Sequence, residues 1–260
     1  MATSDRNPYA RPMGGAVRAD AGVDQGLRSY MLRVYNYMAI GLAITGVAAL
    51  AMVQFAVTDT AANAAAQLPN GMYLTQFGVT LYTSALKWVV MLAPLGMVFF
   101  ISARIGKMST SSAQLAFWVF AGLMGISLSS IFLVYTSESI VRVFFITAAA
   151  FGSLSLYGYT TKRDLSGWGQ FLFMGLIGVI IASVVNLFVA SSALQFAISV
   201  IGVLVFAGLT AYDTQRIKEM YYVGDDSSTA GRKAIMGALS LYLNFINMFV
   251  MLLSLFGNRN

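Results

Sequence analysis

Residues 203–220 read VLVFAGLTAYDTQRIKEM, an apolar run long enough to enter a bilayer. The run carries one ionisable residue, Asp213, before it ends in a short charged group. Placing an aspartate at the centre of a membrane helix costs about 2.5 to 3.5 kcal/mol, so such a residue usually faces the bundle interior or a water path. The stretch therefore predicts a membrane helix whose acid has partners on neighbouring helices.

The whole chain is far more apolar than a soluble domain. Of its 260 residues, 58% are hydrophobic and 10% are charged, and the mean hydropathy is +0.73. Soluble domains carry about 25% charged residues. The chain has neither cysteine nor histidine, so disulfides and thiolate metal sites are excluded, and any proton or ion binding falls to carboxylates, amides, hydroxyls and backbone oxygens. With no phosphate-binding glycine motif and no second acid within a span for aspartyl catalysis, we expect no enzyme and no cofactor.

Seven apolar segments, each near the roughly 20 residues that cross a bilayer, follow a polar N-terminal stretch. We expect residues 1–28 to be a disordered cytoplasmic tail and residues 29–260 to form one all-α, polytopic membrane domain. Residues 58–84 are expected to be the longest loop, with a turn at residues 69–71. The segments cover residues 33–57, 88–103, 113–135, 139–160, 167–190, 193–215 and 234–256.

The distribution of basic residues predicts the orientation. With a cytoplasmic N-terminus, thirteen of the 16 Lys and Arg residues lie inside and three outside, which is a strong positive-inside signal. We therefore predict a multi-pass protein of the cell inner membrane with its N-terminus in the cytoplasm and its C-terminus outside. The net charge of +6 is scattered in short groups at span ends, so we expect the lipid bilayer and no nucleic acid as a partner.

Three residues are potential partners of Asp213. Arg216 lies one turn further along the same helix, Arg104 ends the second span at the same predicted depth, and Asn244 lies deeper in the seventh span. A pair between Arg104 and Asp213 would act as a latch that proton binding weakens, because the attraction needs an ionised carboxylate. A permanent ion pair that ties two helices together is the alternative.

The seventh segment carries a polar stripe. Ser240, Asn244, Asn247 and Ser254 stand at offsets of 0, 4, 7 and 14, which places them on one helical face. One interpretation is hydrogen bonding between helices, worth about 0.6 kcal/mol per contact. The other is that Ser240 and Asn247 line a path that Asp213 guards.

Four motifs follow one another along the chain: GISLSSIFLVYT at 125–136, GYTTKRDLSGWG at 158–169, AYDTQRI at 211–217 and ALSLYLNFINMF at 238–249. In this order they resemble the Bax inhibitor-1 family, the transmembrane Bax-inhibitor-motif proteins, and are most similar to proteobacterial members. The resemblance runs from about Val34 to the carboxyl end. It implies a seven-helix fold with the last helix at the centre, surrounded by two groups of three.

The resemblance also implies a function, since characterised members are pH-sensitive calcium leak channels. In them two aspartates form the pH sensor, and an arginine at the end of the second helix latches the first aspartate. By motif these positions fall on Asp213, Asn244 and Arg104, and the second aspartate is replaced because this chain reads LYLNFIN and not LYLDFIN. Two carboxylates can share a proton, whereas Asp213 and Asn244 cannot. Burial disfavours the ionised form of Asp213, whereas a nearby Arg104 favours it.

Calcium prefers 6 to 8 oxygen ligands, so Asp213 with amide and backbone oxygens offers at best a weak, transient calcium site. A leak tolerates weak binding because ions must also leave. The wider family implies an alternative, because some bacterial members without the seventh-helix aspartate bind a membrane-anchored ATP-dependent protease as modulators. In that alternative the N-terminal tail makes the contact, Asp213 and Arg104 are architectural, and the protein does not conduct. The sequence leaves both functions open, together with the permeant ion and the oligomeric state.

Overall fold

The computed structural model describes residues 14–260, with side chains from Gln25 onward. Seven of its helical segments are long and apolar enough to cross a membrane, and they coincide with the seven predicted segments. The chain is therefore an all-α, polytopic membrane protein. The seven segments are Gln25–Ala56, Leu86–Lys107, Thr110–Val134, Ser137–Thr160, Ser166–Val189, Ser192–Glu219 and Ser227–Phe256.

Eight of the α-helices build the bundle and its ends. The first and last are α1 (Gly14–Ala56) and α9 (Ser227–Phe256), and α5 is a single turn that extends α4 after a break at two serines. A 3₁₀ turn, Ile105–Lys107, continues α3. The remaining helices are α3 (Leu86–Arg104), α4 (Thr110–Leu128), α5 (Ile131–Val134), α6 (Ser137–Thr160), α7 (Ser166–Val189) and α8 (Ser192–Glu219).

Side chains at the helix starts explain where several of these helices begin. The hydroxyls of Ser109, Thr136 and Ser191 each accept a hydrogen bond from the backbone N–H three residues on, which satisfies a donor that the helix itself leaves free. Asp226 caps α9 in the same way. Hydrogen bonding by Thr229 holds the pKa of Asp226 below its usual range, so this cap stays charged at neutral pH.

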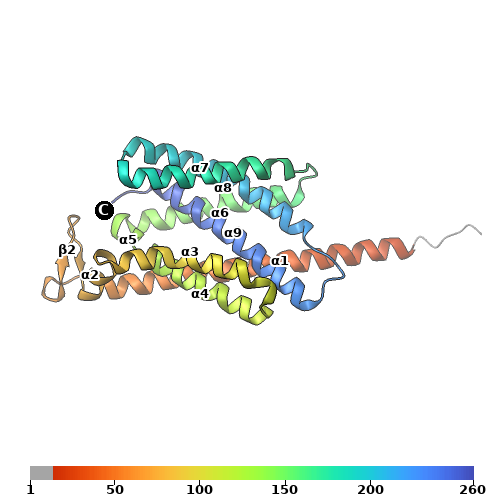
Figure 1. Cartoon of the computed structure of the whole chain (residues 1–260), viewed down its shortest axis with the longest axis horizontal. Helices are drawn as coiled ribbons and strands as arrows, with labels where there is room; N and C mark the ends of the chain where they lie inside the picture. The colour runs from red at the N-terminus through yellow and green to blue at the C-terminus, as the bar shows by residue number, and fades with distance from the viewer. Residues whose placement is uncertain (1–13) are drawn as a thin grey trace, which may run out of the picture.

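Helix α9 is the centre of the bundle. It packs against α8, α1, α6 and α4, and a larger share of its apolar stretch is buried than of any other span. On one side of it α1, α3 and α4 pack together, and on the other side α6, α7 and α8 pack together (Figure 1). The two groups meet mainly through α9, which confirms the arrangement that the resemblance implies.

Two glycines allow the helices within each group to approach closely. A side chain at Gly125 in α4 would collide with the backbone of Thr45 in α1, and one at Gly158 in α6 would collide with the backbone of Ala211 in α8. Because helix association in a bilayer depends on close van der Waals packing, small residues at such crossings favour it. Each group therefore contains a crossing at which a glycine lies against the backbone of the next helix.

The segment expected to be a plain loop, residues 58–84, has structure of its own. Three two-residue strands, β1 (Val57–Thr58), β2 (Ala66–Gln67) and β3 (Tyr73–Leu74), form an antiparallel sheet in the order β1-β3-β2. Helix α2 (Gln76–Thr83) follows, and Thr75 caps its start by accepting a hydrogen bond from Gly78. The segment is the longest connection between two spans and turns at residues 69–71, as predicted. The strands and α2 were not predicted, because such short strands are stabilised by backbone pairing, which leaves almost no pattern in the side chains.

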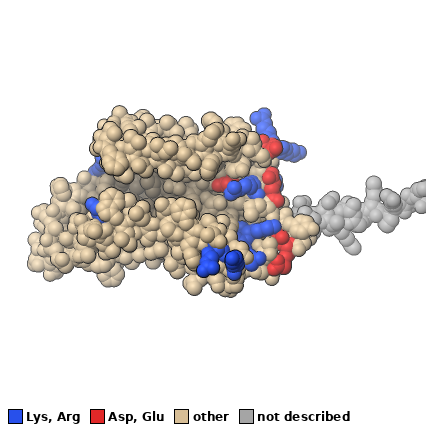
Figure 2. Space-filling model, in the orientation of Figure 1, with Lys and Arg blue, Asp and Glu red and all other residues tan. Residues whose placement is uncertain are grey.

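The predicted tail falls into two parts. Residues 1–13 lie outside the described residues, whereas residues 14–28 belong to α1 and not to a disordered segment. Helix α1 begins at one end of the bundle and the C-terminus lies at the other (Figure 1). Figure 2 shows most charged side chains gathered at the end where α1 begins, and a hollow along the face where α9 runs between the α7–α8 layer and α3.

Candidate functional site

Asp213 is a buried carboxylate whose two oxygens each contact a different group. Its residue surface is 8% exposed, and that of Asn244 is 5% exposed. Asn244 on α9 donates from Nδ2 to Oδ2 of Asp213 at 2.8 Å, and Arg216 on α8 places Nη2 3.1 Å from Oδ1. The side chain of Arg216 is 49% exposed, so the ion pair connects the buried acid to the bundle surface.

Two of the three partners expected for Asp213 are therefore in contact with it, and the third is not. Arg104 is exposed at the end of α3 and lines a shallow cavity of about 380 Å³ with Lys107 and Ser112. Within the described residues the ion pairs are Arg216 with Asp213 and Lys233 with Asp225. In this arrangement the ion pair of Asp213 is thus formed within α8.

The next residue of the motif, Thr214, is linked to a different pair of helices, α6 and α1. Its hydroxyl donates to the carbonyl of Thr210 at 2.7 Å and lies 3.0 Å from the hydroxyl of Ser155 on α6. The hydroxyl of Tyr35 on α1 lies 2.7 Å from that of Ser155. Because the hydrogen of Thr214 is already used, Ser155 donates to Thr214 and Tyr35 donates to Ser155. This hydroxyl chain links α8 to both groups of helices.

Gln215 completes the motif and holds the connection between α6 and α7. Its Oε1 accepts from the backbone N–H of Leu165, and its Nε2 donates to the backbone carbonyl of Arg163, both at 2.8 Å. One turn on, Lys218 donates to the carbonyl of Tyr159 at 2.9 Å. Three consecutive residues of α8 thus bind α9, α6 and the α6–α7 connection.

The residues predicted to line a path are half-buried. Ser240 and Asn247 lie on the partly exposed face of α9 together with Ser254, whereas Asn244 is buried against Asp213. Asn247 donates to the carbonyl of Leu243 in its own helix at 2.8 Å. The stripe therefore divides into one member that touches the acid and others that lie on the partly exposed face.

A second polar cluster at the opposite end of α8 and α9 was not predicted. Asn186 on α7 donates to Gln195 at 3.1 Å, Gln195 donates to Ser254 on α9 at 3.3 Å, and Ser199 donates to Ser254 at 3.1 Å. The signal that would have found it is the same one that marked Asn244, an amide side chain inside or beside an apolar run. All four side chains are neutral. We call these four residues the neutral cluster.

The small number of oxygen atoms around Asp213 limits which cation the site can bind. No three acidic side chains come together as a metal site within the described part of the chain. A cation at Asp213 would meet one carboxylate and, after a rotation of its amide, the oxygen of Asn244, which is fewer oxygens than calcium prefers. It would also have to displace the guanidinium of Arg216.

Comparison with known sequences agrees with this arrangement. A family model described as "Inhibitor of apoptosis-promoting Bax1" matches residues 27–260, which include all seven spans. The chain belongs to the Bax inhibitor-1 family. The match begins at residue 27, two residues after the start of the first span at Gln25, so the family domain and the helix bundle nearly coincide.

Relatives within the Bax inhibitor-1 family cover nearly the whole chain. An uncharacterized protein of Rickettsia prowazekii is 48% identical, over 91% of this chain and 92% of its own. An uncharacterized protein of Caulobacter vibrioides is 46% identical over 96% of both chains. The inner membrane protein YbhL of Escherichia coli is 46% identical over 90% of this chain and 93% of its own.

Proposed function

We propose that this protein is a pH-modulated leak for calcium or another cation, located in the inner membrane as its relative YbhL is. The observation that carries the proposal is the buried carboxylate of Asp213, which joins α8 to the central helix α9 and reaches the surface through Arg216. Ionisable residues inside membrane spans are costly and mark ion paths more often than other positions do.

In this proposal the described arrangement is the closed one. Both oxygens of Asp213 are engaged by donors, Asn244 and Arg216, so neither is free for a passing cation. Protonation of Asp213 removes the attraction to Arg216, because that attraction needs the ionised carboxylate. With a single acid, the pH response follows one proton rather than a shared pair.

The latch assigned to Arg104 belongs to a second arrangement. It requires the group of α1, α3 and α4 to move relative to α8 until Arg104 replaces Arg216 at Asp213. Ser240 and Asn247 on the partly exposed face of α9 then line the path beside which the acid sits. The gate therefore has two states, in which Arg216 or Arg104 pairs with the carboxylate of Asp213.

The test is calcium influx into proteoliposomes across pH 5 to 8 for the wild type, Asp213→Asn and Asn244→Asp. We expect pH-dependent flux in the wild type, a flux without pH dependence in Asp213→Asn, and a steeper dependence in Asn244→Asp. Asp213→Glu, which keeps the acid, is the matched control and should keep the pH dependence. If the wild type passes no more calcium or potassium than empty liposomes at every pH, the leak proposal is wrong.

A second candidate function is a non-conducting modulator of a membrane-anchored ATP-dependent protease. The observation that favours it is that both oxygens of Asp213 already serve contacts that hold helices in place, as an architectural residue would. This candidate predicts that removing residues 1–24 abolishes an effect on proteolysis while Asp213→Asn changes little. The leak predicts the opposite pattern for flux.

The proposed orientation, with the N-terminus in the cytoplasm, has its own test. Because the chain has no cysteine, a single introduced cysteine reports its side of the membrane. In intact spheroplasts a membrane-impermeant maleimide should label Asn63→Cys, in the segment before α2, and should not label Lys162→Cys, between α6 and α7. Labelling of Lys162→Cys alone would reverse the assignment.

A further inference from the structure

A cavity lies at the end of the bundle away from most of the charged residues. It has a volume of about 640 Å³ and is enclosed by the segment before α2, by α2 itself, by α3 and by the α4–α5 break. Small-molecule sites usually occupy about 300 to 1,000 Å³. The cavity is therefore large enough for a ligand, and it shares no lining residue with the site at Asp213.

Most of the cavity wall is apolar. Leucines from four separate segments line it, among them Leu68, Leu81, Leu128 and Leu133. Its shape is fixed by hydrogen bonds, since Asn70 donates to the carbonyl of Leu133 at 2.9 Å. Such walls favour a ligand that is mainly hydrocarbon.

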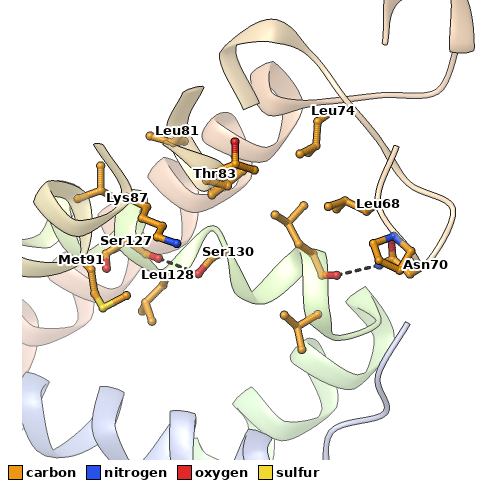
Figure 3. A pocket seen from close by; sticks show the side chains of 15 residues that line it. Leu68, Asn70, Leu74, Leu81, Thr83, Lys87, Met91, Ser127, Leu128 and Ser130 are labelled. Carbon is orange, nitrogen blue, oxygen red and sulfur yellow. Dashed lines mark hydrogen bonds between the residues drawn. The ribbon is translucent and has the colours of Figure 1, made fainter. Parts of the chain in front are cut away.

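One cationic side chain reaches into this apolar space. Lys87, in the first turn of α3, lines the cavity with Ser127 and Ser130. Figure 3 shows the ammonium end of Lys87 directed toward the α4–α5 break, where these two serines lie. The hydroxyl of Ser130 donates to the carbonyl of Ser127 at 3.1 Å, so its hydrogen is already used, and the groups here that can donate to an anion are the ammonium of Lys87 and the hydroxyl of Ser127.

Lys87 has no acidic neighbour in the cavity. No aspartate or glutamate lines it, and the two ion pairs among the described residues involve other side chains. The interaction found for Lys87 is with the ring of Trp88, 5.4 Å from its centroid. A cation beside an apolar cavity without a counter-charge favours a ligand with one anionic group.

The cavity is continuous with the surface that faces lipid. Met91 lines it and is 53% exposed, and Val89 and Leu92, beside it on α3, are also exposed. Lys87 stands at the end of this span, where lipid head groups lie, and the free N–H groups of the first helical turn add positive potential there. A lipid can therefore enter sideways, with its chain in the cavity and its head at the helix end.

We propose that this cavity binds an acyl chain of an anionic phospholipid, with the phosphate held at Lys87 and the hydroxyl of Ser127. The apolar volume accepts the chain, the lysine accepts the charge, and the opening at Met91 connects both to the bilayer. The inference is independent of any ion flux at Asp213, because the two sites lie at different ends of the span helices.

The experiment is native mass spectrometry of the purified full chain in a neutral detergent, titrated with phosphatidylglycerol or with phosphatidylcholine of the same chains. We expect phosphatidylglycerol to bind more tightly to the wild type. Lys87→Gln should weaken phosphatidylglycerol binding about fivefold, the effect of one lysine on an anionic lipid. It should weaken phosphatidylcholine binding less, because the choline of that lipid cancels the charge of its phosphate. Arg142→Gln removes a charge at the same end but outside the cavity, and should change neither.

A second variant tests the cavity itself. Leu68→Trp fills the space from the segment before α2, away from the packed helices, and should reduce binding of both lipids at unchanged melting temperature. The proposal is overturned if Leu68→Trp or Lys87→Gln binds phosphatidylglycerol as the wild type does. It is also overturned, in favour of a free fatty acid, if oleate binds and phosphatidylglycerol does not.

Discussion

Helices α8 and α9 are joined at two places by polar side chains, and the two junctions are built differently. Near the charged end, the carboxylate of Asp213 accepts from Asn244 and pairs with the half-exposed Arg216. At the other end, the neutral cluster joins α7, α8 and α9 by amides and hydroxyls alone. The same pair of helices therefore has one junction whose strength depends on a proton and one whose strength does not.

The difference shows how a membrane protein can keep a titratable contact without losing its fold. Neutral hydrogen bonds between membrane helices are worth about 0.6 kcal/mol each. Their strength does not change with pH in the physiological range, because neither partner titrates there. They hold one end of the helix pair while the other end changes its charge. The charged junction is thus free to respond to protons, and the neutral one keeps the two helices in register.

The largest effect is expected when the charged junction receives a second acid. Asn244→Asp replaces the donor at 2.8 Å from Asp213 by a carboxylate, and two ionised carboxylates in a buried site repel. We expect a loss of about 3 kcal/mol of unfolding free energy at neutral pH. Because one proton between the two oxygens restores a hydrogen bond, the loss shrinks as the pH falls. Melting temperatures in detergent at pH 5 and pH 8 measure it.

The control for this variant is Asn247→Asp, where the new acid lies on the partly exposed face and the hydrogen bond of Asn247 is to its own helix. Its melting temperature should change less between the two pH values than that of Asn244→Asp, because the new acid does not face a second carboxylate. Equal melting temperatures of Asn244→Asp at the two pH values would contradict the contact between the residues at 213 and 244.

A smaller effect is expected when the charged junction loses its acceptor. Asp213→Ala leaves the buried amide of Asn244 without a partner, and an unsatisfied buried donor costs about 1 to 3 kcal/mol. Asp213→Asn keeps an oxygen for the amide and should lose less than half as much. Thermal unfolding of both variants at one pH measures the difference, and equal losses would mean that the ion pair with Arg216, and not the amide contact, stabilises this junction.

Two glutamines of α8 offer a matched pair, one at each end. Gln215→Leu leaves two backbone groups of the α6–α7 connection without a partner, and we expect it to cost about 1 to 2 kcal/mol. Gln195→Leu removes contacts to the side chains of Asn186 and Ser254. These side chains can rotate toward other partners, so this variant should lose less stability than Gln215→Leu. Amide hydrogen exchange at Leu165 and in the first turn of α7 should accelerate in Gln215→Leu alone. Acceleration in both variants would remove the distinction.

The smallest effect is expected in the neutral cluster. Ser254→Ala removes the hydroxyl that Gln195 and Ser199 contact, and should cost about 0.6 kcal/mol. The cost should be the same at pH 5 and pH 8, as measured by the shift in melting temperature. A cost that changes with pH would mean that this end also contains a titrating group.

Much of this architecture was readable from the sequence because apolar runs dominate the energetics of a membrane protein. The seven runs coincide with the seven spans, and helical spacing placed Arg216 within reach of Asp213. Asn244 was one of three potential partners of Asp213, suggested because amides and acids are costly to leave unpaired in a bilayer, and the structure places it in contact. For these residues, local spacing and the cost of burial were enough.

Other contacts depend on how one helix is rotated against another, which spacing does not determine. Ser155 and Tyr35 are two of many hydroxyl side chains in the spans, and nothing in their spacing marks them as partners of Thr214. The match of Arg104 to Asp213 rested on predicted depth alone, and residues at equal depth lie far apart when they face different sides of a bundle. The latch therefore stays a prediction.

The motif at residues 213–215 also constrains how the bundle is able to move. Its three side chains point to α9, to α6 and to the α6–α7 connection, so α8 can neither turn on its own axis nor slide by one turn without breaking a contact. A motion that keeps the contacts of Thr214 and Gln215 moves α6, α7 and α8 together as one rigid body. If that unit turns about the neutral cluster on α9, the contacts that must release are the one at Asp213 and the hydrogen bond between Tyr35 on α1 and Ser155 on α6.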